Sequence, residues 1–204
     1  MSLFITFEGG EGCGKTTQAR VLLRKLSRLG YPVLLSKEPG GTRLGQELAR
    51  RLKNAEADFD PISELFLFAA ARAHFISQVI RPALEKGEIV ISDRFADSTA
   101  AYQGYGRGLD LSFVNAINHA ATGGLRPNLI VLLDIEVEAG LGRKGSKKDR
   151  FEQEEIAFHR RVREGYLKLA TAEPGRWLVV DASKPKGEIT RIIWERVKQL
   201  LPKI

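Results

Sequence analysis

Cysteine and histidine are scarce in this sequence of 204 residues. The single cysteine, Cys13, cannot form an internal disulfide or a multi-cysteine zinc site, so we expect a reducing, cytoplasmic location. The three histidines, His74, His119 and His159, occupy separate segments, and no pair has the spacing of metal ligands. We therefore assign no catalytic or metal-binding role to a histidine.

Long hydrophobic runs are absent as well. The apolar runs, among them Leu3 to Phe7 and Leu129 to Leu133, reach about five residues, whereas a membrane span needs about twenty. The chain enters the first of these runs directly after Ser2, without the pattern of a targeting peptide. We expect a soluble protein with no membrane partner.

The composition is that of a globular protein with a basic balance. Hydrophobic residues make up 43%, enough for a sizeable core, and the length indicates one domain over residues 1–204. The 32 basic and 25 acidic residues give a net charge of +7, which indicates polyanionic partners. Charge alone does not distinguish nucleic acid from nucleotide phosphates.

Five short apolar runs rich in β-branched residues predict the strands of an α/β fold. They cover residues 3–7, 33–35, 89–91, 129–133 and 177–180. Stretches with helical spacing separate them, which predicts parallel strands joined by crossover helices.

Capping and breaking residues mark several of these helices. One helix is expected to stop at Gly30, and another to begin at Asp60 and to kink or end at Pro82. A third follows Asp110 and ends before Gly123. Each of these helix boundaries is predicted from a single capping or helix-breaking residue.

The most specific motif is the segment from Gly9 to Thr16, which fits G-x-x-x-x-G-K-[ST] between a predicted strand and a predicted helix. In such a loop the backbone amides converge on a phosphate, and the helix N-terminus adds partial positive charge. Lys15 is expected to reach the β- and γ-phosphates, and Thr16 to bind Mg²⁺. The predicted ATP-binding residues here are Gly9, Gly10, Glu11, Gly12, Cys13, Gly14, Lys15, Thr16 and Thr17. Cys13 is interpreted as a small side chain in a tight turn, with a reactive thiol as the alternative.

Two further loops follow predicted strands. Glu38-Pro39-Gly40-Gly41-Thr42 follows the second strand, and Asp93 to Gln103 follows the third. In an open parallel sheet both loops leave the carboxyl edge beside the phosphate loop. A phosphate loop identifies only the nucleotide, so these segments must identify the phosphoryl acceptor.

These loops, with Phe68-Ala69-Ala70-Ala71-Arg72 and Asp149-Arg150-Phe151-Glu152, resemble those of bacterial thymidylate kinases, in the same order and over most of the chain. The resemblance implies a three-layer P-loop kinase fold: a five-stranded parallel sheet flanked by helices, with a short lid at about residues 143–150. It also implies ATP with Mg²⁺ as donor, dTMP as acceptor, dTDP as product and a homodimer.

The resemblance places the acceptor base against Phe68 and Arg72, which at i and i+4 project from one helical face. An aromatic face stacks on a pyrimidine, and an arginine, which only donates, suits O4 of thymine and mismatches the amino group of cytosine. This predicts selection against dCMP. The alternative is Phe68 in the core and Arg72 as a solvated charge. By resemblance, Tyr102 covers the deoxyribose and excludes a ribose hydroxyl, and Gln103 approaches the base.

Other acceptor-side residues follow from the resemblance. Glu38 and Glu11 are expected as carboxylates of this site, Glu11 toward the 3′-hydroxyl. Ser98 and Thr99 would add hydrogen bonds near the base, or else serve as helix caps.

The sequence departs from the pattern of many relatives at two positions. Lys37 precedes Glu38 where many carry arginine, which keeps the charge but loses bidentate geometry. Their arginine eleven residues after this glutamate is Ala49 here, and Arg50 can replace it only if the helix is shifted or turned.

Phosphoryl transfer brings two mutually repelling phosphate groups together, so cations and Mg²⁺ must neutralise them. Arg94 is the candidate for bridging donor and acceptor, because its planar fork binds two oxygens. Asp93 is expected to orient the metal, with Thr16, or to accept a proton. The alternative for Asp93 and Arg94 is a buried structural ion pair.

The cationic residues 143–150 contain almost nothing apolar and predict a mobile loop between two helices. The resemblance makes this loop a lid over ATP, with a solubilising loop as the alternative. In the family that the sequence resembles, a catalytic arginine comes either from the phosphate loop or from the lid. The phosphate loop contains none here, so the resemblance implies that the lid supplies it. We favour Arg150, place Arg143 near the adenine or its phosphates, and keep Lys147 and Lys148 as alternatives.

The predicted activity is direct in-line phosphorylation of dTMP by ATP, with Lys15, Arg94, Asp93 and Arg150 as catalytic residues. A kinase for another nucleoside monophosphate or for a deoxynucleoside is the alternative. A GTPase is disfavoured because Asp134-Ile135-Glu136-Val137 is not a guanine-reading Asn-Lys-x-Asp motif. A nucleic-acid-binding ATPase is disfavoured because the cations gather in the lid, so no stable nucleic-acid partner is expected.

Overall fold

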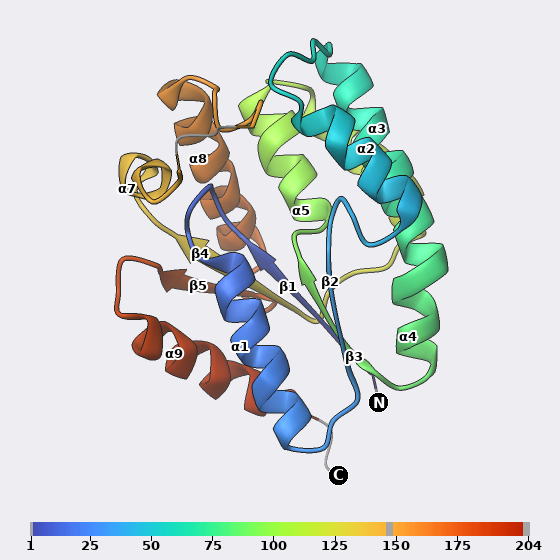
Figure 1. Cartoon of the computed structure of the whole chain (residues 1–204), viewed down its shortest axis with the longest axis vertical. Helices are drawn as coiled ribbons and strands as arrows, with labels where there is room; N and C mark the ends of the chain where they lie inside the picture. Colours follow the sequence, from blue (N-terminus) through green and yellow to red (C-terminus); the bar gives the residue numbers. More distant parts are fainter. Residues whose placement is uncertain (1, 146–148, 202–204) are drawn as a thin grey trace.

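A five-stranded parallel sheet forms the middle layer of the computed structural model, which describes residues 2–145 and 149–201 (Figure 1). The strand order is β2-β3-β1-β4-β5. The strands are β1 (Leu3–Glu8), β2 (Val33–Lys37), β3 (Ile89–Asp93), β4 (Leu129–Asp134) and β5 (Trp177–Asp181). Each of the five predicted strands is confirmed and extends by one or two residues at its carboxyl end.

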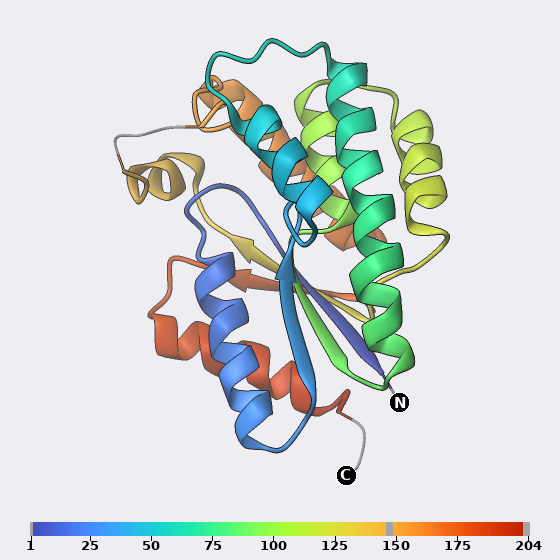
Figure 2. The ribbon, with the colours of Figure 1, turned by 45° about the vertical axis from the view of Figure 1, so that its right-hand side comes forward.

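Helices cover both faces of the sheet, with α1 and α9 on one face and α3, α4 and α8 on the other, while α6 packs on the outside against α3 (Figure 2). The α-helices are α1 (Lys15–Arg28), α2 (Arg43–Lys53), α3 (Pro61–Phe75), α4 (Arg81–Glu85), α5 (Ala96–Thr99), α6 (Leu111–Thr122), α7 (Val137–Gly142), α8 (Ile156–Ala172) and α9 (Lys186–Lys198). Two π-helical segments, η1 (Ile76–Ile80) and η2 (Ala100–Gly106), continue α3 and α5. The predicted three-layer α/β fold is confirmed.

Strand β1 shows how the two apolar layers are built. Its odd-numbered residues Leu3, Ile5 and Phe7 pack into a core with α1 and α9. Phe4 points to the opposite face and packs in a second core with residues of α3 and η1. Because both faces are covered, a central parallel strand is apolar at almost every position, which is the run that the sequence shows.

The predicted helix boundaries are largely confirmed. Asp60 caps α3 by accepting from the backbone N of Ile62 and Ser63, both at 3.0 Å, and Gly30 follows α1 with φ +85°. The prediction for Pro82 differs in detail. The regular α pattern already changes to a π-helix at Ile76, and Pro82 lies in the first turn of α4, which continues this helix to Glu85.

The parallel strands bring the functional loops together. The loops after β1, β2 and β3 all leave the carboxyl edge of the sheet, and α2 and α3 cover this edge from one side (Figures 1 and 2). Within residues 2–145 and 149–201, no helix combines the length and apolar character required to cross a membrane.

Candidate active site

A cavity of about 640 Å³ opens at the carboxyl edge of the sheet. Most of the predicted site residues line it: Glu11, Gly12, Gly14, Lys15, Thr16, Thr17, Glu38, Arg50, Phe68, Arg72, Asp93, Arg94, Ser98, Thr99, Tyr102, Gln103 and Arg143. Segments that are far apart in the sequence therefore meet in one place, as the parallel topology predicts.

The phosphate loop takes a backbone conformation that requires glycine. Gly9, Gly12 and Gly14 have φ of +136°, +67° and +96°, and a Cβ on Gly12 would lie 1.9 Å from the carbonyl oxygen of Gly140. Lys15 starts α1, and its Nζ donates to the carbonyl oxygens of Gly9 at 3.0 Å and Gly10 at 2.7 Å. The ammonium is thus held at the mouth of the loop, where a phosphate would meet it.

Cys13 is buried in this loop, with 2% of its surface exposed. Its Sγ lies 3.4 Å from Nζ of Lys15. The position agrees with the interpretation of Cys13 as a small side chain in a tight turn.

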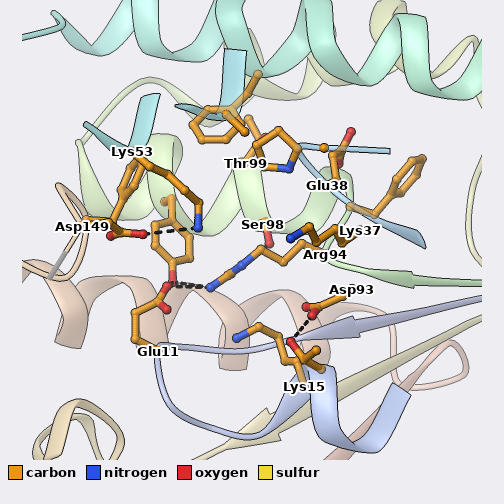
Figure 3. Close-up of a pocket in the computed structure, with 18 of the residues that line it drawn as sticks. Glu11, Lys15, Lys37, Glu38, Lys53, Asp93, Arg94, Ser98, Thr99 and Asp149 are labelled. Carbon is orange, nitrogen blue, oxygen red and sulfur yellow. Dashed lines mark hydrogen bonds and ion pairs between the residues drawn. The ribbon is translucent and has the colours of Figure 1, made fainter. Parts of the chain in front are cut away.

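Thr16 and Asp93 form the candidate metal site. The hydroxyl of Thr16 donates to Oδ2 of Asp93. Asp93 lies beside Lys15 of the phosphate loop (Figure 3). In the described part of the chain, no group of three or more histidine, cysteine or acidic residues could hold a metal ion by itself. Mg²⁺ does not require such a group, because it is commonly held by one or two protein ligands with phosphate oxygens and water. The pair therefore fits a magnesium ion that arrives with a nucleotide.

Arg94 follows Asp93 and is held at the centre of the cavity. Its Nη2 donates to Oε1 of Glu11 at 2.6 Å (Figure 3). Nη2 also donates to the hydroxyl of Tyr102 at 3.0 Å, and Nη1 donates to the carbonyl oxygen of Gly9 at 3.2 Å. Its φ of +76° is rare for a residue with a side chain. Surrounding contacts must hold this backbone conformation, which brings the guanidinium to the phosphate loop.

Glu11 is the acidic partner of this arginine. Burial would raise the pKa of Glu11, but Arg94, Lys15 and the hydroxyl of Tyr102 outweigh it and keep this pKa well below its ordinary value. Glu11 is therefore an ionised acceptor at neutral pH, suited to a donor such as a sugar hydroxyl.

Arg72 and Glu38 lie deeper in the same cavity. Nε of Arg72 donates to Oε2 of Glu38 at 3.0 Å, and its Nη atoms donate to Asn118 at 2.6 Å, Thr99 at 2.8 Å and the carbonyl oxygen of Phe95 at 3.3 Å. Arg72 is thus buried, and the alternative of a solvated charge is wrong. Four contacts use four of its five N–H groups, so one donor remains for a ligand.

Aromatic rings form one wall of the cavity. Phe151 lies 5.9 Å from Phe68 and 5.9 Å from Tyr102, measured between ring centroids. Phe68 is half-buried and lines the cavity, and Tyr102 donates its hydroxyl to Glu11 at 2.8 Å. This wall offers aromatic surface to a planar ligand, with Phe151 tilted by 54° against Phe68 and by 80° against Tyr102.

Gln103 and Arg150 share a buried acceptor that the sequence did not indicate. Nε2 of Gln103 donates to Oε1 of Glu64 at 2.7 Å, and Nη2 of Arg150 donates to Oε2 of the same carboxylate. Arg150 also donates from Nε to the carbonyl oxygen of Leu52 at 3.0 Å. Arg150 does not line the cavity in this conformation, whereas Arg143 does.

Residues 143–150, the predicted lid, follow α7, and the structure describes residues 143–145 and 149–150 of this segment. Arg143 donates to the carbonyl oxygen of Ala182 at 3.2 and 3.3 Å, which brings the start of the lid to the end of β5. Lys147 and Lys148, the alternative catalytic cations, lie outside the described residues.

Comparisons with known proteins agree with this geometry. A family model described as thymidylate kinase matches residues 7–193. The chain belongs to the thymidylate kinase family. It is 54% identical over 203 residues to a thymidylate kinase of Dehalococcoides mccartyi, with 98% of each chain covered. It is 50% identical over 200 residues to one of Synechococcus sp., with 98% of this chain and 96% of the relative covered.

A solved structure shows the same architecture. The crystal structure of thymidylate kinase from Ehrlichia chaffeensis superposes with a TM-score of 0.78 at 35% sequence identity, and the match covers 98% of this chain and 99% of that one. The predicted family and fold are confirmed, and with them the prediction that the chain is a phosphotransferase of the dTMP kinase type. These comparisons favour none of the alternative functions.

Several residues of this thymidylate kinase site were not predicted. Lys53 and Lys144 line the cavity, Lys53 paired with Asp149 at 3.2 Å and Lys144 with Glu152 at 2.5 Å. Lys144 belongs to the cationic segment 143–150 and could have been found there. Nothing in the sequence marked Lys53 as a site residue, because it is one of several basic residues on a predicted helix. Only the tertiary fold brings it to the cavity.

Proposed function

We propose that the 640 Å³ cavity binds both nucleotides of the reaction, ATP at the phosphate loop and dTMP between the aromatic wall and Arg72. As a member of the thymidylate kinase family, the chain transfers the γ-phosphoryl group of ATP to dTMP and releases dTDP. The observation that carries the site assignment is the position of Arg94, between the phosphate loop and the residues predicted to hold the acceptor.

On the donor side, the amides of the phosphate loop and the ammonium of Lys15 neutralise the β- and γ-phosphates. Thr16 and Asp93 would hold Mg²⁺, which supplies further charge neutralisation when it is bound with ATP. Arg143 lines the same cavity and is placed to contact the adenine or its phosphates.

On the acceptor side, Phe68 stacks on the thymine ring while the remaining N–H of Arg72 donates to its O4. Tyr102 packs against C2′ of the sugar and leaves no room for a ribose hydroxyl. Glu11, kept ionised by its cationic neighbours, accepts from the 3′-hydroxyl. Each contact uses a group whose side chain already lines the cavity.

The remaining acceptor-side predictions concern the edges of this site. Gln103 approaches the base from its position beside Glu64, and Ser98 and Thr99 add hydroxyl groups near it. Glu38 keeps Arg72 in place, and exposed Arg50, one residue after Ala49, provides a cation for the acceptor phosphate. A panel of single alanine variants, with the KM for dTMP as readout, tests them.

Arg94 bridges the transferred phosphoryl group and the acceptor phosphate. Its guanidinium presents two nitrogens to the cavity and exchanges Glu11 and Gly9 for phosphate oxygens when both nucleotides are bound. The lid supplies the second arginine, Arg150, after a movement that takes it from Glu64 to the phosphates. The reaction then proceeds by positioning and charge neutralisation, with no covalent enzyme intermediate.

The decisive test is a coupled assay of ADP release with dTMP, dUMP, dCMP, dGMP and thymidine offered separately. We expect the highest kcat/KM with dTMP and a strong loss with dCMP, because the amino group of cytosine meets the donor of Arg72. A preference for thymidine over dTMP would overturn the proposed substrate.

We further propose that the chain acts as one domain in a homodimer in the cytoplasm, with no nucleic-acid or membrane partner. Sedimentation at equilibrium tests the dimer, and a single species of monomer mass would contradict it. ADP release that depends on DNA and is indifferent to dTMP would contradict the absence of a nucleic-acid partner.

A further inference from the structure

Glu8 is a buried carboxyl group that the proposed mechanism does not use. It is the last residue of β1, its side chain is fully buried, and it makes three hydrogen bonds. Oε1 accepts from the backbone N of Phe95 at 2.7 Å, and Oε2 accepts from the hydroxyls of Ser98 at 2.6 Å and Tyr166 at 2.9 Å. None of these contacts involves a group of the phosphate loop.

All three partners of Glu8 are also neighbours of Arg94. Phe95 directly follows it, and Nη1 of Arg94 donates to the hydroxyl of Ser98 at 3.2 Å and to that of Tyr166 at 3.2 Å. Glu8 thus holds the backbone on one side of Arg94 and the two hydroxyls on which its guanidinium rests. Since Arg94 has φ +76°, such contacts are needed to keep its side chain at the phosphate loop.

The number of protons between these groups shows why a carboxyl group is required. Oε2 of Glu8 and the hydroxyls of Ser98 and Tyr166 form a triangle of contacts at 2.6, 2.9 and 2.9 Å, and each contact can hold at most one proton. The two hydroxyls supply two protons. A carboxylate adds none and a carboxylic acid adds one, so glutamate in either state leaves no proton pointing at Arg94.

A glutamine at this position has the same shape but the wrong number of protons. Its oxygen must face the N–H of Phe95, so its NH₂ group faces the two hydroxyls and brings the count to four protons for three contacts. The fourth proton has no acceptor within the triangle, and the hydroxyl that carries it also meets Nη1 of Arg94, itself a donor. The opposite amide orientation would set two donors against each other over 2.7 Å.

We propose that Glu8 is a positioning residue for phosphoryl transfer, which holds Arg94 in the cavity through Phe95, Ser98 and Tyr166. The inference rests on the proposed bridging role of Arg94. Glu8 touches no nucleotide in this scheme and acts only by fixing where the guanidinium lies.

The test is a kinetic double-mutant cycle with Glu8→Gln and Arg94→Lys. We expect Glu8→Gln to lower kcat about 10- to 100-fold, because displacing a catalytic group by about 1 Å has effects of this size, and to leave the KM for ATP within about threefold. In the Arg94→Lys background, which lacks the Nη1 that meets both hydroxyls, Glu8→Gln should change kcat about twofold or less.

Thr6→Val is the matched control. Thr6 lies two residues before Glu8 on the same strand, is fully buried, and its hydroxyl has no hydrogen-bond partner among the described residues. Valine keeps the shape and removes the hydroxyl, so kcat should stay within about twofold of the unsubstituted chain. An equal loss of kcat in Thr6→Val and Glu8→Gln would overturn the inference, because any change in β1 would then suffice.

The outcomes separate the inference from the proposed function. If Arg94→Lys lowers kcat while Glu8→Gln does not, or if Glu8→Gln has the same effect in both backgrounds, only the inference is wrong. If Arg94→Lys leaves kcat unchanged, the bridging role is wrong and the inference falls with it.

Tyr166→Phe carries the same test if Glu8→Gln yields too little folded enzyme. It removes one hydroxyl between Glu8 and Arg94 and adds no proton. We expect a smaller loss of kcat, about 3- to 10-fold, that again disappears in the Arg94→Lys background. A loss that persists there would overturn the inference.

Discussion

Arg72 of α3 forms an ion pair with Glu38 in the protein interior, where Nε and Oε2 lie 3.0 Å apart and the side chains are 1% and 2% exposed. Burial raises the pKa of Glu38, and Arg72 opposes this shift by its charge and its hydrogen bond. The second oxygen of Glu38 has no hydrogen-bond partner within the described residues. The carboxylate therefore depends on Arg72 to remain ionised in the interior.

Arg72→Ala should destabilise the protein by about 3–5 kcal/mol, because it leaves Glu38 as a buried charge without its partner. Arg43→Ala is the control, since Arg43 is 95% exposed and its pair with Glu47 should contribute less than about 1 kcal/mol. Urea denaturation of both variants measures the difference. Equal stabilities would show that the interior pair does not stabilise the fold.

Glu8 predicts an unusual dependence of stability on pH. Burial and the nearby Asp97 raise the pKa of Glu8 from 4.5 to about 8, against the opposing effects of Ser98, Arg94 and Tyr166. The folded protein then binds this proton more tightly than the unfolded chain does. The resulting stability is complete below pH 4.5 and is lost as the pH rises through about 8.

The measurement is the free energy of unfolding at about pH 5.5 and about pH 8.5. It should fall over this interval in the unsubstituted chain and in Thr6→Val, and fall less in Glu8→Gln, which has no titrating group at this position. Burial also raises the pKa of Asp97, to about 6, so part of the fall should persist in Glu8→Gln. Identical pH profiles for all three proteins would contradict the assignment to Glu8.

Gly140 allows close contact between α7 and the backbone of the phosphate loop. A Cβ at Gly140 would lie 2.4 Å from the carbonyl oxygen of Glu11, whereas a Cβ at Gly142 would meet nothing within 4 Å. Gly140→Ala should raise the KM for ATP about tenfold and cost about 1–3 kcal/mol of stability, since the loop backbone must shift. Gly142→Ala should change neither quantity. A normal KM in Gly140→Ala would show that the loop adapts freely.

The proposed catalytic role of Arg150 is separable from its structural one. Arg107 also donates to Glu64, at 3.1 Å, and makes a second ion pair with Glu154 at 2.6 Å. Both Arg150→Ala and Arg107→Ala should lower the thermal midpoint, because each removes a partner of a buried carboxylate. Only Arg150→Ala should also lower kcat, by about 10³-fold, if this arginine meets the phosphates.

Arg143→Ala completes the comparison of the lid arginines. It should raise the KM for ATP, because Arg143 lines the cavity, and change kcat less than Arg150→Ala does. An unchanged kcat in both arginine variants would overturn the assignment of the catalytic cation to an arginine of the lid.

Strands, several helix ends and the phosphate loop could be predicted because neighbouring residues decide them. Apolar β-branched runs indicated β1, and Asp60 and Gly30 marked helix ends through bonds and backbone angles within a few residues. The cluster around Glu64 could not be predicted in this way. Its carboxylate meets Gln103 and Arg150, 39 and 86 residues away, and only packing brings them together.

By itself, the order of residues in this chain was sufficient for the sheet and for the loop that receives a phosphate, because short-range periodicity and glycine-dependent backbone angles are local properties. The kinase family followed from the resemblance of its motifs to those of known relatives. Only the tertiary structure decided which buried charges meet. In the sequence, Glu8 is simply the residue that follows a predicted strand. Ser98 and Tyr166 are 90 and 158 positions away along the chain, and only packing brings them to Glu8. In a low-dielectric interior, such partners decide whether a buried charged group stabilises or destabilises the folded protein.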